Sequence, residues 1–437
     1  MLKRTCTFLL LVFLLLSVVS CAKSPETLTE DQPVISDPVL PESDAEDQNV
    51  SDEEKGDSEE EPVVEETRKT SFFATGDNLI HTGIWRQANR NVGGSGDGCQ
   101  MDSEYDFLPF YEAIADSVKS ADVAFLNQET LVAADEDNGP LNYPTFNTPR
   151  ALGDAMIELG FDVVNVANNH MLDMQANGLK NSVEYWRTKD ELTQIGAYLD
   201  ESDYNTVRVV EKNGIKIAFL AYAEDANNSG RGLEIGVSNY HNYSSLGLYI
   251  PAMDEAELTR QVEEAKKQAD FVVVAFHWGV ENSSVVSAVQ TRYAELCASL
   301  GVDVVLGSHP HVIQPMEWMD SAKAASGKTL VVYSLGNMIS LMESTAGNLL
   351  GGALTLDFVK NGETYSIENV VLSPIVTHCS ASYREIALYR LEDYSDEIYR
   401  AHYIHGHLST SVSDFYQMMV ERIPREFWGD ADYNLNT

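Results

Sequence analysis

The stretch VDVVLGSHPHV at residues 302–312 is an apolar, strand-like run followed by two histidines. Its apolar run ends in Gly307, and His309 and His311 follow on either side of Pro310. Other apolar runs also end in residues that can bind a metal, namely SFFATGD at 71–77, DVAFLNQE at 122–129, DVVNVANNH at 162–170 and FVVVAFHWGVE at 271–281. Because ligands of open α/β sheets bind at the carboxyl ends of the strands, we expect these residues to meet at one site.

The residues after these runs are of the types that hold divalent metals. Imidazole nitrogens combined with carboxylate or amide oxygens form a suitable donor set. The candidates are Asp77, Glu129, Asn169, His277, His309 and His311. Each alone has an ordinary explanation, since an aspartate can cap a turn and a histidine can be buried in a core. Their recurrence after successive apolar runs favours a metal site, and a carboxylate-bridged metal pair needs about this inventory.

Helix-like segments separate the strand-like runs. MDEAELTRQVEEAKKQA at 253–269 and SAVQTRYAELCASL at 287–300 have apolar residues at helical spacing. This alternation predicts an α/β protein in which helices cover the faces of a sheet. Asn-Gly pairs at 213–214 and 361–362 lie between strand-like runs and predict hairpins, so part of the sheet should be antiparallel.

The N-terminus has the organisation of an export signal. Residues 3–21, KRTCTFLLLVFLLLSVVSC, begin with basic residues and continue as an apolar run that ends in small residues. The run is shorter than the ~20 residues that cross a bilayer. Its end resembles a bacterial lipobox, so we predict a lipoprotein signal peptide at 1–21 with lipidation of Cys21; an uncleaved anchor and plain secretion are the alternatives. Residues 22–70 are rich in acidic residues and proline and predict a disordered linker.

The composition excludes some partners. The formal net charge of −39 argues against nucleic acid, because that affinity depends on lysine and arginine neutralising phosphates. An anionic substrate would need a local positive centre, which a bound metal could supply. Most of the charge is also explained by an acidic, solvated surface. Cys99, Cys297 and Cys379 indicate no disulfide framework, although one pair could form.

Several motifs together resemble the CapA family of capsule and poly-γ-glutamate synthesis proteins, within the metallophosphatase superfamily. They are GDNLIH at 76–81, NQE at 127–129, ANNHMLD at 167–173, HWGVE at 277–281, GSHPHVIQP at 307–315 and YSLGN at 333–337. The resemblance implies the calcineurin-like phosphoesterase fold, a four-layer α-β-β-α sandwich of two mixed sheets flanked by helices. We expect this domain at 71–375 and a C-terminal helical extension, packed on it as a cap, at 376–437.

The resemblance also implies roles for individual residues. Two divalent ions, of manganese, iron or zinc, would be bound by Asp77, His81, Glu129, Asn169, His277, His309 and His311. His170 would act as the catalytic acid, with Asp173 orienting it unless Asp173 only caps a turn. The predicted substrate-binding residues are Asn127, Asn168, Glu281, Gln314 and Asn337. The chain departs from the superfamily pattern in the spacing of GDNLIH, in the glutamate of NQE and in the inserted Ser308.

These features predict an extracytoplasmic protein that a lipid anchor tethers to the bacterial cell membrane. It would act in biosynthesis, export or processing of an anionic capsule polymer such as poly-γ-glutamate, and its partners would be that polymer or its synthase complex. A non-catalytic assembly factor of a polymer synthase and a general metal-dependent phosphoesterase are the alternatives.

Overall fold

The computed structural model describes residues 66–437 except 97–103, 136–137, 225–247, 252 and 434–437. The predicted signal peptide, Cys21, Cys99 and the predicted linker up to residue 65 lie outside the described residues. Strand β1 (Thr67–Asn78) begins before residue 71, where the domain was expected to start. The first residues of β1 pair with the end of β14 (Leu350–Asn361), with Thr67 opposite Asn361, so these polar residues belong to the sheet and not to the linker.

The first sheet combines a parallel and an antiparallel half. Its strands follow the order β16-β15-β14-β1-β2-β5-β6, and β13 (Asn337–Ile339) pairs in parallel with the end of β1. The strands parallel to β1 are β2 (Val123–Gln128), β5 (Val163–Asn165) and β6 (Thr193–Ile195). The antiparallel half consists of β14, β15 (Thr364–Cys379) and β16 (Ile386–Arg390).

The second sheet has a parallel centre and antiparallel edges. Its order is β11-β12-β10-β9-β8-β7. The central strands are β8 (Ile215–Ala223), β9 (Phe271–His277), β10 (Val304–Ser308) and β12 (Lys328–Val332), and the edges are β7 (Arg208–Lys212) and β11 (Met316–Asp320). A small parallel pair, β3 (Val132–Ala134) with β4 (Thr148–Pro149), lies apart from both sheets. The prediction of mixed sheets is confirmed.

The sheets face each other across a shared core. Phe72 of β1 lies 6.2 Å from Phe219 of β8, and Phe271 of β9 lies 4.8 Å from Phe358 of β14, measured between ring centroids. Alternate residues of β9 enter different cores: Phe271, Val273 and Ala275 face the first sheet, whereas Val272, Val274 and Phe276 face helices. Both faces of β9 are therefore buried, which explains its unbroken apolar sequence.

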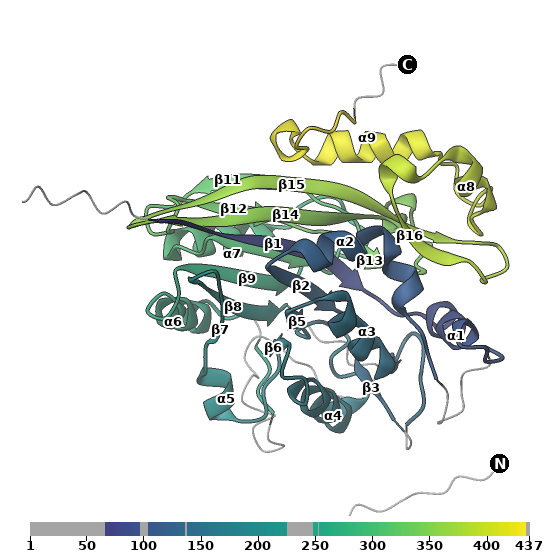
Figure 1. The fold of residues 1–437 in the computed structure, drawn as a ribbon, viewed down its shortest axis with the longest axis horizontal. Coiled ribbons are helices and arrows are strands. Elements are labelled where there is room, and N and C mark those ends of the chain that lie inside the picture. Colours follow the sequence, from purple (N-terminus) through teal and green to yellow (C-terminus); the bar gives the residue numbers. More distant parts are fainter. Residues whose placement is uncertain (1–65, 97–103, 136–137, 225–247, 252, 434–437) are drawn as a thin grey trace, which may run out of the picture. The chain divides into compact units, whose positions relative to one another are not determined.

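Helices cover the outer faces of the sheets, as Figure 1 shows. The second sheet is covered by α6 (Glu255–Ala265) and α7 (Ala288–Leu300), which begin at Asp254 and Ser287 caps, so both helices predicted there are confirmed. The remaining helices before the C-terminal region are α1 (Thr82–Asn91), η1 (Leu108–Tyr111), α2 (Glu112–Ser120), α3 (Ala151–Leu159), α4 (Gln175–Arg187), α5 (Glu201–Asn205) and η3 (Ala346–Leu349). The four-layer α-β-β-α architecture is confirmed.

Both predicted hairpins are present. Strands β7 and β8 are antiparallel, and the turn between them places Asn213 and Gly214 at φ of 52° and 73°. Strands β14 and β15 are antiparallel around Gly362, at φ 58°. Asparagine and glycine tolerate these left-handed conformations, which is why the dipeptide predicted the turns.

The C-terminal region is helical only in part, so the predicted helical extension at 376–437 needs correction. Residues 376–379 complete β15, and β16 then adds an edge strand. Helices α8 (Asp396–Ala401) and α9 (Val412–Arg422) follow, with η4 (Leu391–Asp393) and η5 (Arg425–Phe427) beside them. In β16 the buried Ile386 and Leu388 alternate with less buried neighbours, which is the period of a strand. Figure 1 shows α9 lying along β15.

Among the described residues, no helix has both the length and the apolar character needed to cross a bilayer.

Candidate metal centre

The ends of parallel strands from both sheets converge on one group of side chains. Asp77 is the penultimate residue of β1 and Glu129 directly follows β2, both in the first sheet. His277 ends β9, and His309 follows the last residue of β10 in the second sheet. The convergence at strand ends that the sequence predicts is therefore present.

The backbone approaches closely at the strands that carry these ligands. A Cβ atom on Gly76 would lie 1.9 Å from the carbonyl oxygen of Gly336, and one on Gly307 would lie 1.9 Å from that of Tyr333. Only glycine fits at either position. His309 and His311 adopt φ values of 93° and 57°. Such left-handed conformations cost on the order of 1–3 kcal/mol each and cluster at functional sites.

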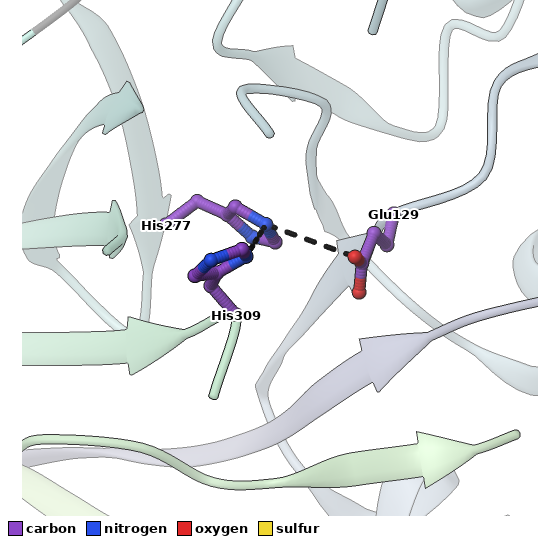
Figure 2. Close-up of side chains that lie close together, drawn as sticks. All are labelled: Glu129, His277 and His309. Atoms are coloured by element: carbon purple, nitrogen blue, oxygen red, sulfur yellow. Dashed lines mark hydrogen bonds and ion pairs between the residues drawn. The ribbon is translucent and has the colours of Figure 1, made fainter. Parts of the chain in front are cut away.

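Glu129 occupies the centre of the group. Its Oε1 lies 3.7 Å from Nε2 of His277 and 3.5 Å from Nε2 of His311. The residue is fully buried, and neither carboxylate oxygen has a hydrogen-bond partner. Figure 2 shows the carboxylate directed at the His277 ring, with His309 beside that ring. Burying a carboxylate that accepts no hydrogen bond is unfavourable, and a bound cation would compensate for it.

The first candidate group contains Glu129, His277 and His309, whose ligand atoms all lie within 4.8 Å of one another. Nε2 of His277 is 3.0 Å from Oδ1 of Asn169 and 3.0 Å from Nδ1 of His309. The Ser308 hydroxyl donates to the Phe276 carbonyl, so it accepts a hydrogen bond from Nδ1 of His277, 3.2 Å away. The lone pair of His277 is therefore on Nε2, directed into the group.

The second candidate group contains Asp77, Glu129 and His311, all buried. Nδ1 of His311 lies 3.0 Å from Oδ2 of Asp77 and 3.0 Å from Oδ1 of Asn337. The Asn337 amide nitrogen donates to the carbonyl oxygens of His311 and Asn348, at 3.3 and 2.9 Å, so Oδ1 is the atom that faces the ring. Nδ1 of His311 therefore carries a proton, and its Nε2 faces Glu129.

Glu281 belongs to a third group, with His309 and His311. It is exposed, in contrast to Glu129. It lies in the loop after β9, and its carboxylate oxygen is within 4.8 Å of ligand atoms of His309 and His311. Glu281 was predicted from sequence to contact substrate, whereas the geometry also makes it a candidate metal ligand.

His170 lies in the loop after β5 and is held by Asp173. Nδ1 of His170 is 2.8 Å from Oδ2 of Asp173, which also accepts a 2.6 Å hydrogen bond from the backbone nitrogen of Phe146. The Phe146 ring packs edge-on against His170, with centroids 4.8 Å apart. A carboxylate on Nδ1 leaves Nε2 of His170 for chemistry, as expected for a functional histidine. The orienting role predicted for Asp173 thus has the required contact.

His81 lies outside the three groups just described. It precedes α1, its Nδ1 accepts a hydrogen bond from the Leu341 backbone nitrogen, and its ring packs against Phe146 at 5.3 Å. Burial lowers the pKa of His81 to about 4. A metal-binding role for His81 stays a prediction.

Four residues predicted to bind substrate have protein partners for their amide groups. Asn127 donates to Asp77 at 2.8 Å and accepts from Asn165, while Asn168 donates to the Gln128 carbonyl and accepts from the His170 backbone nitrogen. Gln314 accepts from Gln290 and donates to the Ser283 and Val285 carbonyls. Asn337 orients His311. These contacts position the ligands and their loops, and direct contact with substrate stays a prediction.

The buried donors differ in protonation. Burial lowers the pKa of His277 well below its usual value and that of His309 to about 3, so both rings are neutral. Burial raises the pKa of Glu129 well above its usual value. Burial also opposes a charged His311, but the Glu129 and Asp77 carboxylates outweigh it and raise the pKa of His311 to about 10. The Glu129–His311 pair therefore holds a proton at neutral pH.

Metal binding should release that proton, because metal ligands must be deprotonated. The folded pKa of His311 is raised to about 10, so the bound proton competes with metal at every pH below that value. We expect metal affinity to rise with pH across the range 6 to 8.5, by roughly tenfold per unit for each proton released. Calorimetric titration with manganese in buffers of different ionisation enthalpy measures this release. An affinity independent of pH would contradict it.

The donor set fits a divalent metal. It combines neutral imidazoles, carboxylates and the Asn169 amide oxygen, and Glu129 supplies buried oxygens without hydrogen-bond partners.

The sequence did not indicate several residues that support these ligands. They are Phe146 behind His170, Asn165 behind Asn127, and Asn282 and Asn348 beside His311; Ser308 was noticed only as an insertion. An asparagine inside the apolar run DVVNV was the one available signal, for Asn165.

The two-sheet fold and the imidazole and carboxylate donors at its strand ends define an α/β protein with a candidate metal centre. The family described as "Bacterial capsule synthesis protein PGA_cap" matches residues 71–342, and the chain belongs to that family. The resemblance to CapA is confirmed.

Two curated relatives align with part of the chain. The capsule biosynthesis protein CapA of Bacillus anthracis is 31% identical over 189 residues, covering 42% of this chain and 41% of the relative. The PGA biosynthesis protein CapA of Bacillus subtilis (strain 168) is 32% identical over 183 residues, covering 42% and 43%. The aligned part is thus about two-fifths of either relative. Among solved structures, a phosphatase of Mycoplasma pneumoniae is similar, at 14% identity and a TM-score of 0.41, covering 71% of this chain and 95% of that one.

Proposed function

We propose that this chain is a membrane-tethered, extracytoplasmic CapA-like protein with a dinuclear metal site. It acts in biosynthesis, export or processing of an anionic capsule polymer such as poly-γ-glutamate. The observation that carries the metal part is Glu129, which is common to the His277–His309 group and the Asp77–His311 group and lacks any hydrogen-bond partner. Family membership and the names of the two relatives support a role with this polymer.

The site residues have distinct tasks in this proposal. Glu129, with Asn169, His277 and His309, would hold one divalent ion, and Glu129 with Asp77 and His311 would hold the other. Bound ions of this kind would act as Lewis acids. They would lower the pKa of a bound water to about 7 and hold the oxygens of a phosphoryl group. His170, oriented by Asp173, donates a proton to the leaving group. Manganese, iron and zinc all suit these donors.

The tether and location rest on the sequence. The basic start, apolar run and lipobox-like end of residues 3–21 support lipidation at Cys21, and the acidic stretch that follows supports a spacer between membrane and domain. The net charge of −39 opposes broad adhesion to an anionic polymer, so recognition of one would need a local positive centre, which the metal ions would supply.

Complementation tests the function. In a Bacillus strain that lacks its own CapA, the native chain should restore surface polymer, whereas the double variant Asp77→Ala and His309→Ala should not. In the same strain, cell fractionation tests the tether, because Cys21→Ser should move the protein out of the membrane fraction. Full polymer production by a folded double variant would favour a non-catalytic assembly factor. No restoration by the native chain, together with turnover of a chromogenic phosphate ester with manganese, would favour a general phosphoesterase.

A further inference from the structure

Asn348 lies in η3, outside the family match at 71–342. It is fully buried, and its side chain contacts two loops that carry candidate ligands. Its amide nitrogen donates to Oδ1 of Asn282 at 2.7 Å and to the carbonyl oxygen of His311 at 3.3 Å. One side chain therefore connects the loop after β9 to the loop after β10.

A second contact holds the same two loops together. The backbone nitrogen of Asn282 donates to the carbonyl oxygen of Pro310 at 2.8 Å. Asn282 directly follows Glu281, and Pro310 lies between His309 and His311. The two hydrogen bonds of Asn282 thus fix Glu281 relative to both histidines, and Asn348 supplies the one that depends on a side chain.

Asn348 also acts on His311 through Asn337. The backbone carbonyl oxygen of Asn348 accepts from the Asn337 amide nitrogen at 2.9 Å, which turns Oδ1 of Asn337 toward Nδ1 of His311. This arrangement directs Nε2 of His311 toward Glu129. Partners that orient metal-binding histidines in this way commonly change metal affinity by about 10–100-fold when they are removed.

We propose that Asn348 is a positioning residue for the ligand group formed by Glu281, His309 and His311. This inference rests on the proposed metal site and extends it to a residue beyond the family match. Asparagine is required because the side chain must both donate and accept. Its Oδ1 accepts from the Thr345 backbone nitrogen at 2.8 Å, which caps η3, while its nitrogen holds the two loops.

The aspartate variant separates the positioning role from the capping role. Asn348→Asp keeps an oxygen for the Thr345 nitrogen but loses the donors to Asn282 and His311. Asn282→Ala removes the acceptor of the Asn348–Asn282 hydrogen bond. Because Asn282 lies in a partly exposed loop, this variant can be measured even if a variant at Asn348 does not fold. Asn89→Ala is the matched control, because Asn89 is a buried asparagine in α1 whose amide bonds the Glu104 carbonyl and the Gly96 nitrogen.

Manganese titration of the purified full chain by calorimetry, paired with thermal unfolding without metal, tests the proposal. We expect Asn348→Ala, Asn348→Asp and Asn282→Ala each to weaken one manganese-binding step by about 10–100-fold. Asn89→Ala should lower the unfolding temperature while leaving manganese affinity unchanged. The Asn282→Ala and Asn348→Ala double variant should lose no more affinity than the worse single variant, since both remove one link.

Native affinity in Asn348→Asp and Asn282→Ala, while the native chain binds manganese, would overturn the positioning role and leave the proposed function standing. An additive loss in the double variant would also overturn it. Failure of the native chain to bind any divalent metal would overturn the metal site itself, and the inference with it.

Discussion

Replacing Glu129 with glutamine should abolish tight binding of both metal ions while leaving the metal-free protein at least as stable as the native one. Glu129 is common to two ligand groups, so its loss affects both, and we expect affinity to fall by more than about 100-fold. The metal-free protein should tolerate the change because the native carboxylate is buried without a hydrogen-bond partner. Manganese titration and thermal unfolding measure the two effects.

The same variant makes a prediction about pH. Burial raises the folded pKa of Glu129, so its contribution to stability is present below its unfolded pKa and is lost as pH rises through the folded pKa. Glutamine does not titrate. In the metal-free protein, Glu129→Gln should therefore remove the part of the loss of stability with rising pH that is due to ionisation of Glu129. Glu281→Gln is the matched control, since Glu281 is exposed and belongs to one group alone. A Glu129→Gln protein that keeps both ions would show that Glu129 is not the shared ligand.

Replacing His170 with alanine should reduce turnover of a phosphate ester by about 10²–10⁴-fold while metal content stays at two ions. His170 is held by Asp173 at 2.8 Å and belongs to none of the three ligand groups found among the described residues. Its loss should therefore remove proton transfer and not the metal. Steady-state kinetics with a chromogenic ester, alongside metal analysis, measure the two quantities separately.

Two further variants complete this test. Asp173→Asn should keep His170 in place but weaken its orientation, so its activity should fall between that of the native chain and that of His170→Ala. His407→Ala changes an exposed histidine far along the chain and should have native activity. Equal loss of metal and activity in His170→Ala would mean that His170 is a ligand and not the acid.

The apolar runs predicted the α/β class because the central strands are buried on both faces, whereas the sandwich of two sheets was implied by the family resemblance. Strands such as β9 and β10 appear as unbroken apolar runs, and the polar residues that follow them have no reason to be there except a turn or a site. Asp77, Glu129, His277, His309 and His311 were predicted for that reason, and the structure brings them together. Strand β16 was missed because its short alternation lies in a segment dominated by aromatic and helix-forming residues.

Residues that position the ligands could not be predicted in the same way. Asn348 contacts residues 66 and 37 positions away, and only the folded chain places them side by side. Ser308 looked like an insertion in a histidine motif, whereas its hydroxyl determines which nitrogen of His277 faces the site. The backbone nitrogen of Phe146 donates to Asp173 from a loop that contains none of the motifs quoted from the sequence. Such roles depend on hydrogen-bond direction, which a sequence pattern does not encode.

The most direct test of the dinuclear site is a crystal structure of the full chain grown with manganese, using anomalous scattering to locate the ions. We predict two ions on either side of Glu129, one contacting His277 and His309 and the other contacting Asp77 and His311. A single ion, or ions that do not contact Glu129, would contradict the account.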